Sequence, residues 1–279
     1  MKQLLFYDRP AALHRERHRA WKIDNTGEHF SFARQTNSVV VTGMEFVHLA
    51  KEYPIVFAQV GERIVPLVLL GLRTHENLFV DEAGRWNARY IPAFVRRYPF
   101  VLADAGEGNW TVHIDEGFAG FNTRTGLSLF DEAGVQTPML ERAIRFLKEY
   151  QEQSQRTELF VNRLQKLALL SGLTAQIERT DGEKIVMGGL LAVEEKKLLA
   201  LDPEDSMALL RAGELGWIYA HLLSLANLGR LSEMVGKTGP LLPPTATEAP
   251  ERDLMAPQEA PVAEKAVPAR PTRKTRKKR

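Results

Sequence analysis

Arginines and aromatic residues gather in one short stretch of the sequence, a pairing typical of sites that bind an anionic group. The stretch, residues 85–98, is called here the arginine–aromatic segment and contains Arg85, Trp86, Arg89, Tyr90, Arg96, Arg97 and Tyr98. A guanidinium group can donate two parallel hydrogen bonds to a carboxylate or phosphate, and a neighbouring ring adds a rigid contact surface. These seven residues form the candidate ligand-binding site. The alternative is structural: the rings belong to the core, and the arginines lie on the surface or pair with Asp81 and Glu82.

Residues that could transfer protons are present, but no recognised catalytic pattern connects them. The candidates are Asp104, His113, Asp115, Glu116 and His221. The sequence has no serine-nucleophile, metal-binding or dinucleotide-binding motif to join them. We therefore assign no catalytic residue and no cofactor. We expect Asp115 and Glu116 to lie in a solvated turn, and His221, which has apolar neighbours, to be structural.

Two histidines, His14 and His18, stand four residues apart, which on a helix would give a spacing suited to zinc. The surrounding segment is rich in charge and offers no third ligand. A solvated segment explains the pattern better, and we assign no metal site.

Residues 237–279 differ from the rest of the chain in composition. Proline, alanine, threonine and glutamate dominate, and the chain ends in RPTRKTRKKR. Such a composition buries too little apolar area to offset the entropy of ordering, so we expect a disordered basic tail. Its charges could bind nucleic acid or another polyanion without reading a sequence; they are Arg270, Arg273, Lys274, Arg276, Lys277, Lys278 and Arg279. A solubilising tail without a partner is the alternative.

The bulk composition predicts an ordinary globular protein. Its 279 residues are 44% hydrophobic and 26% charged, which suffices for a full core, and we expect one domain over residues 1–236. The absence of cysteine excludes disulfides, thiolate metal sites and cysteine nucleophiles. No apolar run reaches the roughly 20 residues of a membrane helix, and residues 1–10 do not resemble a signal peptide. A cytoplasmic location is the expectation.

Turn signals between apolar runs predict three β-hairpins. They pair residues 55–60 with 63–70, 77–81 with 85–90, and 173–179 with 184–193. Pro66 cannot donate a hydrogen bond to a sheet, so it predicts a bulge or an unpaired side within the first hairpin. The return strand of the second hairpin would place its rings and its arginines on opposite faces. Further strands are expected at 100–102 and 110–115, with a loop at 104–109.

Caps and helical periodicity predict the helices that cover this sheet. Thr42 and Glu45 form a capping box before a short helix that ends near residue 52. A second short helix follows Ile91-Pro92, and residues 137–170 form two helices or one long helix with a polar middle. Another helix starts at Pro203, and a final one starts at about Glu214. The expected fold is α+β, an antiparallel hairpin-rich sheet covered by helices.

An ordered series of short motifs resembles the SapC family of bacterial proteins. The motifs are Glu45-Phe46, Tyr53-Pro-Ile-Val-Phe57, Asn77-Leu-Phe-Val-Asp81, Gly84-Arg-Trp86, Tyr90-Ile-Pro, Arg96-Arg-Tyr-Pro-Phe100 and Tyr219-Ala-His-Leu222. The resemblance spans about residues 13–231. It implies an accessory role linked to the paracrystalline surface layer or its export, with partners among those proteins. It implies no catalytic residue set and no cofactor.

Three functions follow as hypotheses. The first is an accessory or binding protein, as the resemblance implies. The second is an enzyme or a protein that binds a small anion, and the third is nonspecific binding of polyanions by the tail. We favour the first.

Overall fold

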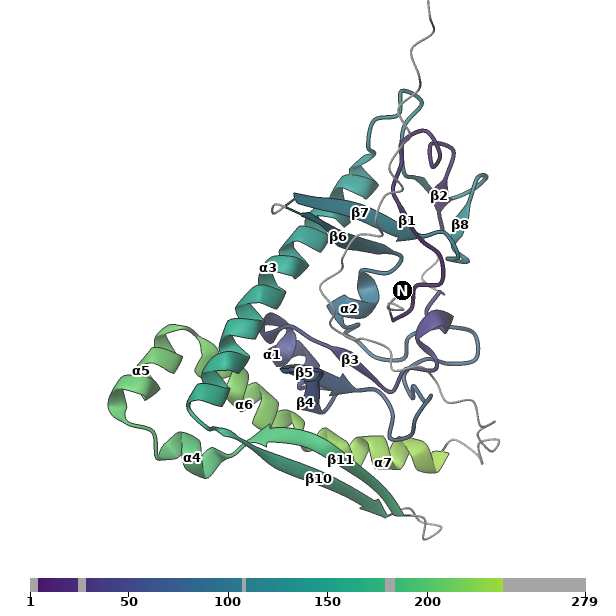
Figure 1. Ribbon diagram of the computed structural model, residues 1–279. Coiled ribbons are helices and arrows are strands. Elements are labelled where there is room, and N and C mark those ends of the chain that lie inside the picture. Colours follow the sequence, from purple (N-terminus) through teal and green to yellow (C-terminus); the bar gives the residue numbers. More distant parts are fainter. Residues whose placement is uncertain (1–4, 25–28, 107–108, 179–183, 238–279) are drawn as a thin grey trace, which may run out of the picture.

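The structure is a computed structural model that describes residues 5–24, 29–106, 109–178 and 184–237 (Figure 1). These residues form antiparallel sheets with helices packed around them, which confirms the predicted α+β class. Of the predicted tail, only Lys237 lies within the described residues.

The largest sheet has five strands and is built on the first predicted hairpin. Its order is β10 (Leu170–Glu178), β11 (Lys184–Val193), β4 (Ile55–Val60), β5 (Arg63–Leu69) and β3 (Ser38–Val40). The turn between β4 and β5 contains Gly61 with a φ of 58°, a conformation that glycine adopts without steric cost. The third predicted hairpin is β10 with β11, and β11 joins it to β4.

Pro66 lies within β5, where the sheet accommodates a residue that lacks a backbone N–H group. The register of β5 with β4 runs without a shift through the Pro66–Phe57 pair. On the other side of β5, the strand β3 ends at Val40, and the next residue, Val41, donates its N–H to the Pro66 carbonyl oxygen at 3.1 Å. The N–H and C=O of one strand residue point to the same neighbour, so the missing donor falls beside the end of β3. The strand therefore needs no bulge.

The second predicted hairpin, in residues 77–90, is present only around its turn. An isolated bridge joins Val80 to Trp86, Asn87 N donates to the Phe79 carbonyl oxygen at 2.7 Å, and the turn has the predicted positive φ, 81° at Gly84. Beyond the bridge, the backbone N–H groups of Arg89 and Tyr90 donate to the Glu52 carboxylate instead of to a strand. A side chain from another segment thus replaces the sheet partner. The predicted alternation of burial persists without the strand: Trp86, Ala88 and Tyr90 are half-buried, while Arg85, Asn87 and Arg89 are exposed.

The other strands form two smaller sheets of three strands each. One has the order β1 (Pro10–Ala12), β7 (Asn109–Asp115) and β6 (Phe100–Gly106), and the other has the order β8 (Phe121–Asn122), β2 (Lys22–Ile23) and β9 (Leu127–Ser128). β6 is longer than the predicted strand at 100–102. Part of the predicted loop at 104–109 is therefore strand, because Ala103 and Asp104 continue the pairing with β7.

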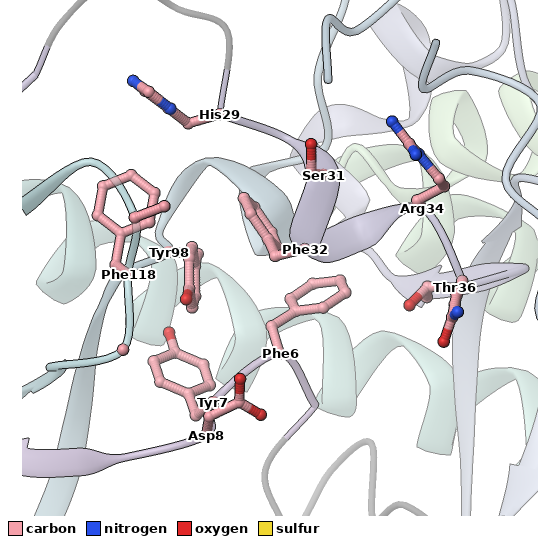
Figure 2. Close-up of a pocket in the computed structure, with 13 residues that line it drawn as sticks. Phe6, Tyr7, Asp8, His29, Ser31, Phe32, Arg34, Thr36, Tyr98 and Phe118 are labelled. Atoms are coloured by element: carbon pink, nitrogen blue, oxygen red, sulfur yellow. The ribbon is translucent and has the colours of Figure 1, made fainter. Parts of the chain in front are cut away.

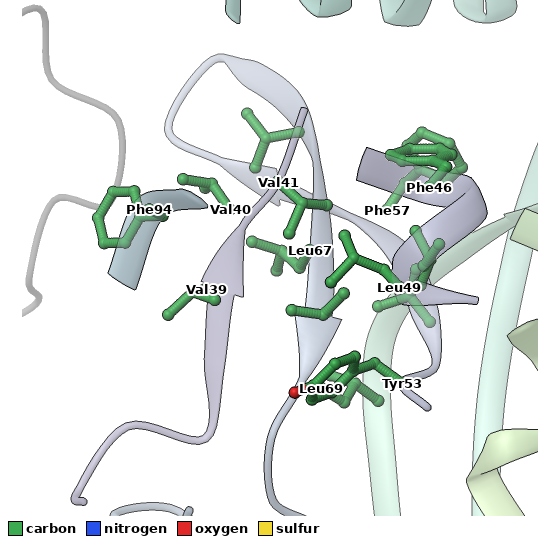
Figure 3. Packing of buried hydrophobic residues seen from close by; sticks show 14 of the residues in the cluster. Val39, Val40, Val41, Phe46, Leu49, Tyr53, Phe57, Leu67, Leu69 and Phe94 are labelled. Carbon is green, nitrogen blue, oxygen red and sulfur yellow. The ribbon is translucent and has the colours of Figure 1, made fainter. Parts of the chain in front are cut away.

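The predicted capping box is present at the start of a short helical segment. The 3₁₀ helix η2 (Gly43–Glu45) leads into α1 (Phe46–Leu49), and the Glu45 carboxylate accepts from both Thr42 N and Thr42 Oγ1 at 3.0 Å. A second 3₁₀ helix, η1 (Ser31–Ala33), lies earlier in the chain, and α2 (Ala93–Arg96) is the predicted helix after Ile91-Pro92. In Figure 3, Phe94 of α2 lies beside β3, while Phe46 and Leu49 of α1 lie beyond β5.

The final predicted helix is two helices in the structure. Four helices close the described chain: α4 (Glu195–Leu199), α5 (Pro203–Arg211), α6 (Glu214–Ser224) and α7 (Asn227–Lys237). The break between α6 and α7 is anchored by Asn227, whose Nδ2 donates to the carbonyl oxygens of Ala50 and Tyr53. α6 packs on β4 and β11, and α7 packs on β10 (Figure 1).

Residues 138–166 form one long helix, α3 (Pro138–Lys166), which is the second of the two alternatives predicted for residues 137–170. It extends from the β6–β7 sheet to the β10–β11 hairpin (Figure 1). Leu140 and Leu147 belong to a small core cluster with the β6–β7 sheet, whereas Phe160 and Leu164 belong to the main core. The predicted polar middle of this helix is the stretch between the two clusters, where residues 148–156 are exposed or only partly buried.

Candidate functional site

The second half of the arginine–aromatic segment lines a pocket of about 320 Å³ with residues from α3. We call this the arginine pocket, and its lining residues are Ile23, Arg96, Arg97, Tyr98, Pro99, Phe100, Arg142, Ala143 and Phe146. Three of these carry a guanidinium group, and none is an aspartate or glutamate. The lining therefore has an excess of positive charge beside apolar walls.

Arg96 is held in place by uncharged partners. Its Nε donates to the Ile91 carbonyl oxygen at 2.9 Å, and its Nη2 donates to the Tyr90 hydroxyl at 3.2 Å. The guanidinium carbon lies 5.4 Å from the centre of the Tyr90 ring and 4.9 Å from that of Phe146. These contacts orient the group, and among the described residues its charge has no carboxylate partner.

Arg97 carries a buried donor with no hydrogen-bond partner. Its guanidinium carbon lies 4.0 Å from the centre of the Phe94 ring and 5.2 Å from that of Tyr150, and its Nε is buried and unpaired among the described residues. Such an unmade hydrogen bond costs about 1–3 kcal/mol. The neighbouring phenols do not neutralise the charge, because burial raises the pKa of Tyr7 and of Tyr150 despite the opposing effect of Arg97.

Arg142 comes from a distant part of the chain and is absent from the site predicted by sequence. Helix α3 places Arg142 and Phe146 one turn apart on the same face, so both reach the pocket. Within the described residues, no hydrogen bond or ion pair occupies the Arg142 side chain, which is exposed. The spacing of Arg142 and Phe146 is visible in the sequence, but the packing of α3 against residues 96–100 is not.

The other predicted ligand-binding residues do not line this pocket. Arg85 pairs with Asp81 at 2.9 Å, as the structural alternative predicts. Trp86 packs against neighbouring rings and donates Nε1–H to the Tyr53 hydroxyl at 2.9 Å. Arg89 is exposed and is tethered through its backbone.

Tyr90 supports the pocket indirectly. Its hydroxyl donates to Glu45 Oε1 at 3.2 Å and accepts from Arg96. Burial and the nearby Glu45 carboxylate raise the pKa of Tyr90 to about 12, so the phenol keeps its proton. The structure thus brings together Arg96, Arg97 and Tyr98, with Tyr90 behind Arg96.

The expectation that Asp115 and Glu116 lie in a solvated turn is wrong. Asp115 is fully buried, and its carboxylate accepts from the backbone N–H groups of Asp8, Arg9 and Gly117 and from the Tyr98 hydroxyl at 2.8 Å. Glu116 pairs with Arg17 at 2.7 Å and contacts His18. The N-terminal segment folds back over the strand end and removes both carboxylates from open solvent.

The remaining proton-transfer candidates do not converge. Asp104 accepts from Gly106 N at 2.7 Å, and burial lowers the pKa of His113 on the neighbouring strand. His221 lies in α6, fully buried, where its Nε2 accepts from Val193 N at 3.0 Å and its Nδ1 lies 2.8 Å from the Ile55 carbonyl oxygen. The structural role expected for His221 is what the structure shows.

His14 and His18 do not lie on a helix. His18 is fully buried, its Nδ1 accepts from His14 N at 2.9 Å, and its Nε2 lies 3.0 Å from Glu116 Oε1. Both ring nitrogens of His18 therefore have protein partners. Across the described ranges, no group of three or more histidine, cysteine, aspartate or glutamate residues is arranged to hold a metal ion.

The family comparison agrees with the resemblance to the SapC family that the sequence motifs indicate. No helix in the described part of the chain is long and apolar enough to cross a membrane. Comparison with curated proteins and with solved structures gives no match. The family model of SapC matches residues 13–231, which include every residue of the arginine pocket. The chain belongs to the SapC family.

Proposed function

We propose that this SapC-family protein binds a small ligand that presents a carboxylate or phosphate group to the arginine pocket. The observation that carries the proposal is the set of three lining arginines, Arg96, Arg97 and Arg142, with no acidic side chain among the lining residues. Like charges held close together repel one another, and an anion would relieve that repulsion. A guanidinium can donate to an anion in a forked geometry, and the Arg142 side chain has no other partner among the described residues.

The walls of the arginine pocket favour a ligand with an apolar part as well. Ile23, Phe100 and Phe146 line it, and aromatic faces beside a charged group give orientation as well as contact area. Phenyl phosphate and benzoate combine both features, whereas benzyl alcohol supplies the ring without the charge. These three compounds are the probes.

The decisive variant is Arg142→Gln, because this exposed side chain has no protein partner to lose within the described residues. Calorimetric titration should show that phenyl phosphate or benzoate binds and benzyl alcohol does not. Arg142→Gln and Arg96→Gln should each weaken the anion by at least about tenfold, or 1.4 kcal/mol. Arg145→Gln is the matched control, since Arg145 is exposed on the same helix and does not line the pocket.

Three results would contradict the proposal. The first is the absence of saturable binding by either anion, and the second is binding that Arg142→Gln and Arg96→Gln leave unchanged. Equal weakening by Arg145→Gln would show a general effect of charge on the helix surface and would also count against a defined site.

The accessory role linked to the surface layer and its export rests on the family name, and partners among those proteins stay a prediction. A cytoplasmic location stays a prediction too. Polyanion binding by the tail is a separate proposal, because Arg270, Arg273 and the five basic residues after them lie outside the described residues. It is independent of the arginine pocket.

A further inference from the structure

A second, larger pocket shares Tyr98 with the arginine pocket and is lined by several aromatic rings (Figure 2). Its volume is about 480 Å³, and we call it the aromatic pocket. Its lining includes Phe6, Tyr7, Asp8, Phe32, Tyr98 and Phe118. These residues come from the N-terminal segment, from η1, from the turn after α2 and from the loop after β7, so only the tertiary fold assembles them.

The rings that wall this pocket contact one another, two of the pairs at steep angles. Tyr98 and Phe118 are perpendicular with ring centres 5.3 Å apart, and Phe6 and Phe32 meet at 74° with centres 5.0 Å apart. Tyr98 and Phe32 lie closer, at 4.0 Å. Phe32, Tyr98 and Phe118 line the pocket and are only partly buried, and an aromatic face left open to a pocket attracts an organic cation.

The charged groups around the aromatic pocket leave one carboxylate without a counter-ion. The backbone N–H of Asp8 donates to Asp115, which fixes its position, while its own carboxylate is exposed and has no partner among the described residues. His29 instead pairs with Asp24 at 3.3 Å. Arg34, a cationic residue that also lines the pocket, donates to the carbonyl oxygens of residues 81 and 82, and in Figure 2 its side chain points away from the ring cluster.

The pocket also keeps Tyr98 as a neutral phenol. Burial raises the pKa of Tyr98, and the hydrogen bond that its hydroxyl donates to Asp115 raises that pKa further. Its oxygen is turned to the buried carboxylate. Tyr98 therefore offers its ring, and no hydroxyl proton, to a ligand on this side.

We propose that the aromatic pocket binds an organic cation with apolar substituents on nitrogen, such as a quaternary ammonium group. The rings of Phe32, Tyr98 and Phe118 supply the faces that attract the cation, and the free carboxylate of Asp8 neutralises it. Such a site prefers a charged alkylammonium group to a neutral group of the same shape. It uses other residues than the arginine pocket, apart from Tyr98, and does not depend on the function proposed there.

Choline and its uncharged isostere 3,3-dimethyl-1-butanol form the test pair, titrated into the full chain by calorimetry or by chemical-shift changes. Choline should bind saturably and the isostere at least about tenfold more weakly, because cation–π attraction contributes about 0.5–2 kcal/mol per site. Asp8→Asn and Phe118→Leu should each raise the choline Kd by about two- to thirtyfold, the same range expressed as a ratio.

Matched variants separate this site from general effects. Glu62→Gln removes an exposed carboxylate outside the pocket and should leave choline binding unchanged, and so should Arg142→Gln in the other pocket. Circular dichroism reports whether Phe118→Leu keeps its fold, and Asp8→Asn preserves the backbone donor to Asp115. Failure of choline to bind, equal binding of the isostere, or unchanged choline binding in Asp8→Asn and Phe118→Leu would each overturn the proposal.

Discussion

Buried polar side chains in this protein join segments that lie far apart in the sequence. Asp115 ties the residues before β1 to the end of β7 through three backbone N–H groups and the Tyr98 hydroxyl. His221 bridges β4 and β11 through Ile55 and Val193. A buried polar group is stable only when its hydrogen bonds are made, so each of these residues specifies one arrangement of the elements around it.

The pH dependence of stability follows from the burial of His221. Burial lowers its pKa to about 4 in the folded state, against about 6.5 in the unfolded chain. Between these values the unfolded state binds a proton that the folded state does not. The contribution of neutral His221 to the free energy of unfolding should therefore be complete above about pH 6.5. The free energy of unfolding should fall by up to about 3 kcal/mol as the pH drops to 4.

Urea unfolding of the wild type and of His221→Gln over this pH range checks the size of the effect. The variant should be less stable at pH 7, because the amide cannot reproduce both ring contacts, but its stability should fall less on acidification. His113 contributes in the same direction in both proteins, since burial lowers its pKa too. Parallel pH profiles for the two proteins would refute the assignment.

At the scale of elements, the 3₁₀ helix η2 contacts both α2, which carries Arg96 of the arginine pocket, and α6. Glu45 accepts from the N–H of Ala93 at 2.6 Å, so the capping box of η2 also holds the start of α2 and, through it, Arg96 and Arg97. On its other side η2 approaches α6 so closely that a Cβ atom at Gly43 would lie 2.3 Å from the Trp217 ring. No side chain fits at this position without movement.

Gly43→Ala should therefore lower the free energy of unfolding by about 1–3 kcal/mol, the usual cost of overpacking a core. Gly216→Ala in α6 is the matched control, because a Cβ atom there meets nothing within 4 Å. That change should be neutral or stabilising by about 0.5–1 kcal/mol, since alanine favours a helix over glycine. Chemical denaturation of both variants measures the difference, and a Gly43→Ala protein as stable as the wild type would disprove the close approach.

At the scale of the whole molecule, helix α3 joins two core clusters. Its first half packs with Phe100 and Ile114 in the small cluster, and its second half packs with the main core through Phe160 and Leu164. The arginine pocket lies beside the first half, where Arg142 and Phe146 reach residues 96–100. Because one helix packs in both clusters, unfolding of one cluster should destabilise the other. The prediction of one domain over residues 1–236 requires this coupling.

Two leucine substitutions test this coupling. Leu147→Ala empties a buried position of the small cluster and Leu164→Ala one of the main core, and each should cost about 2–5 kcal/mol. If the clusters form one cooperative unit, both variants unfold in a single transition that coincides by circular dichroism and tryptophan fluorescence. A split transition in Leu147→Ala alone would mean that the small cluster unfolds separately.

The local elements of this fold could largely be predicted, because they depend on neighbouring residues. The β4–β5 and β10–β11 hairpins, the capping box at Thr42 and the start of α3 after Thr137 all follow from turn residues, caps and periodicity. The hairpin at 77–90 could not be excluded locally, because the Glu52 carboxylate that replaces its strand partner comes from another segment. The same holds for the burial of Asp115 beneath residues 8 and 9.

For the candidate site, the sequence by itself determined the chemistry on offer: guanidinium groups and rings within residues 85–98, and a family resemblance that the SapC match confirms. Only the tertiary structure decided which of them share a pocket. It set Arg96 and Arg97 beside Arg142 of α3, left Arg85 and Arg89 outside that pocket, and made Tyr98 a lining residue of both pockets. The reason is physical: hydrogen bonds and periodicity within a segment are local, whereas a pocket is formed by contacts between elements distant in sequence.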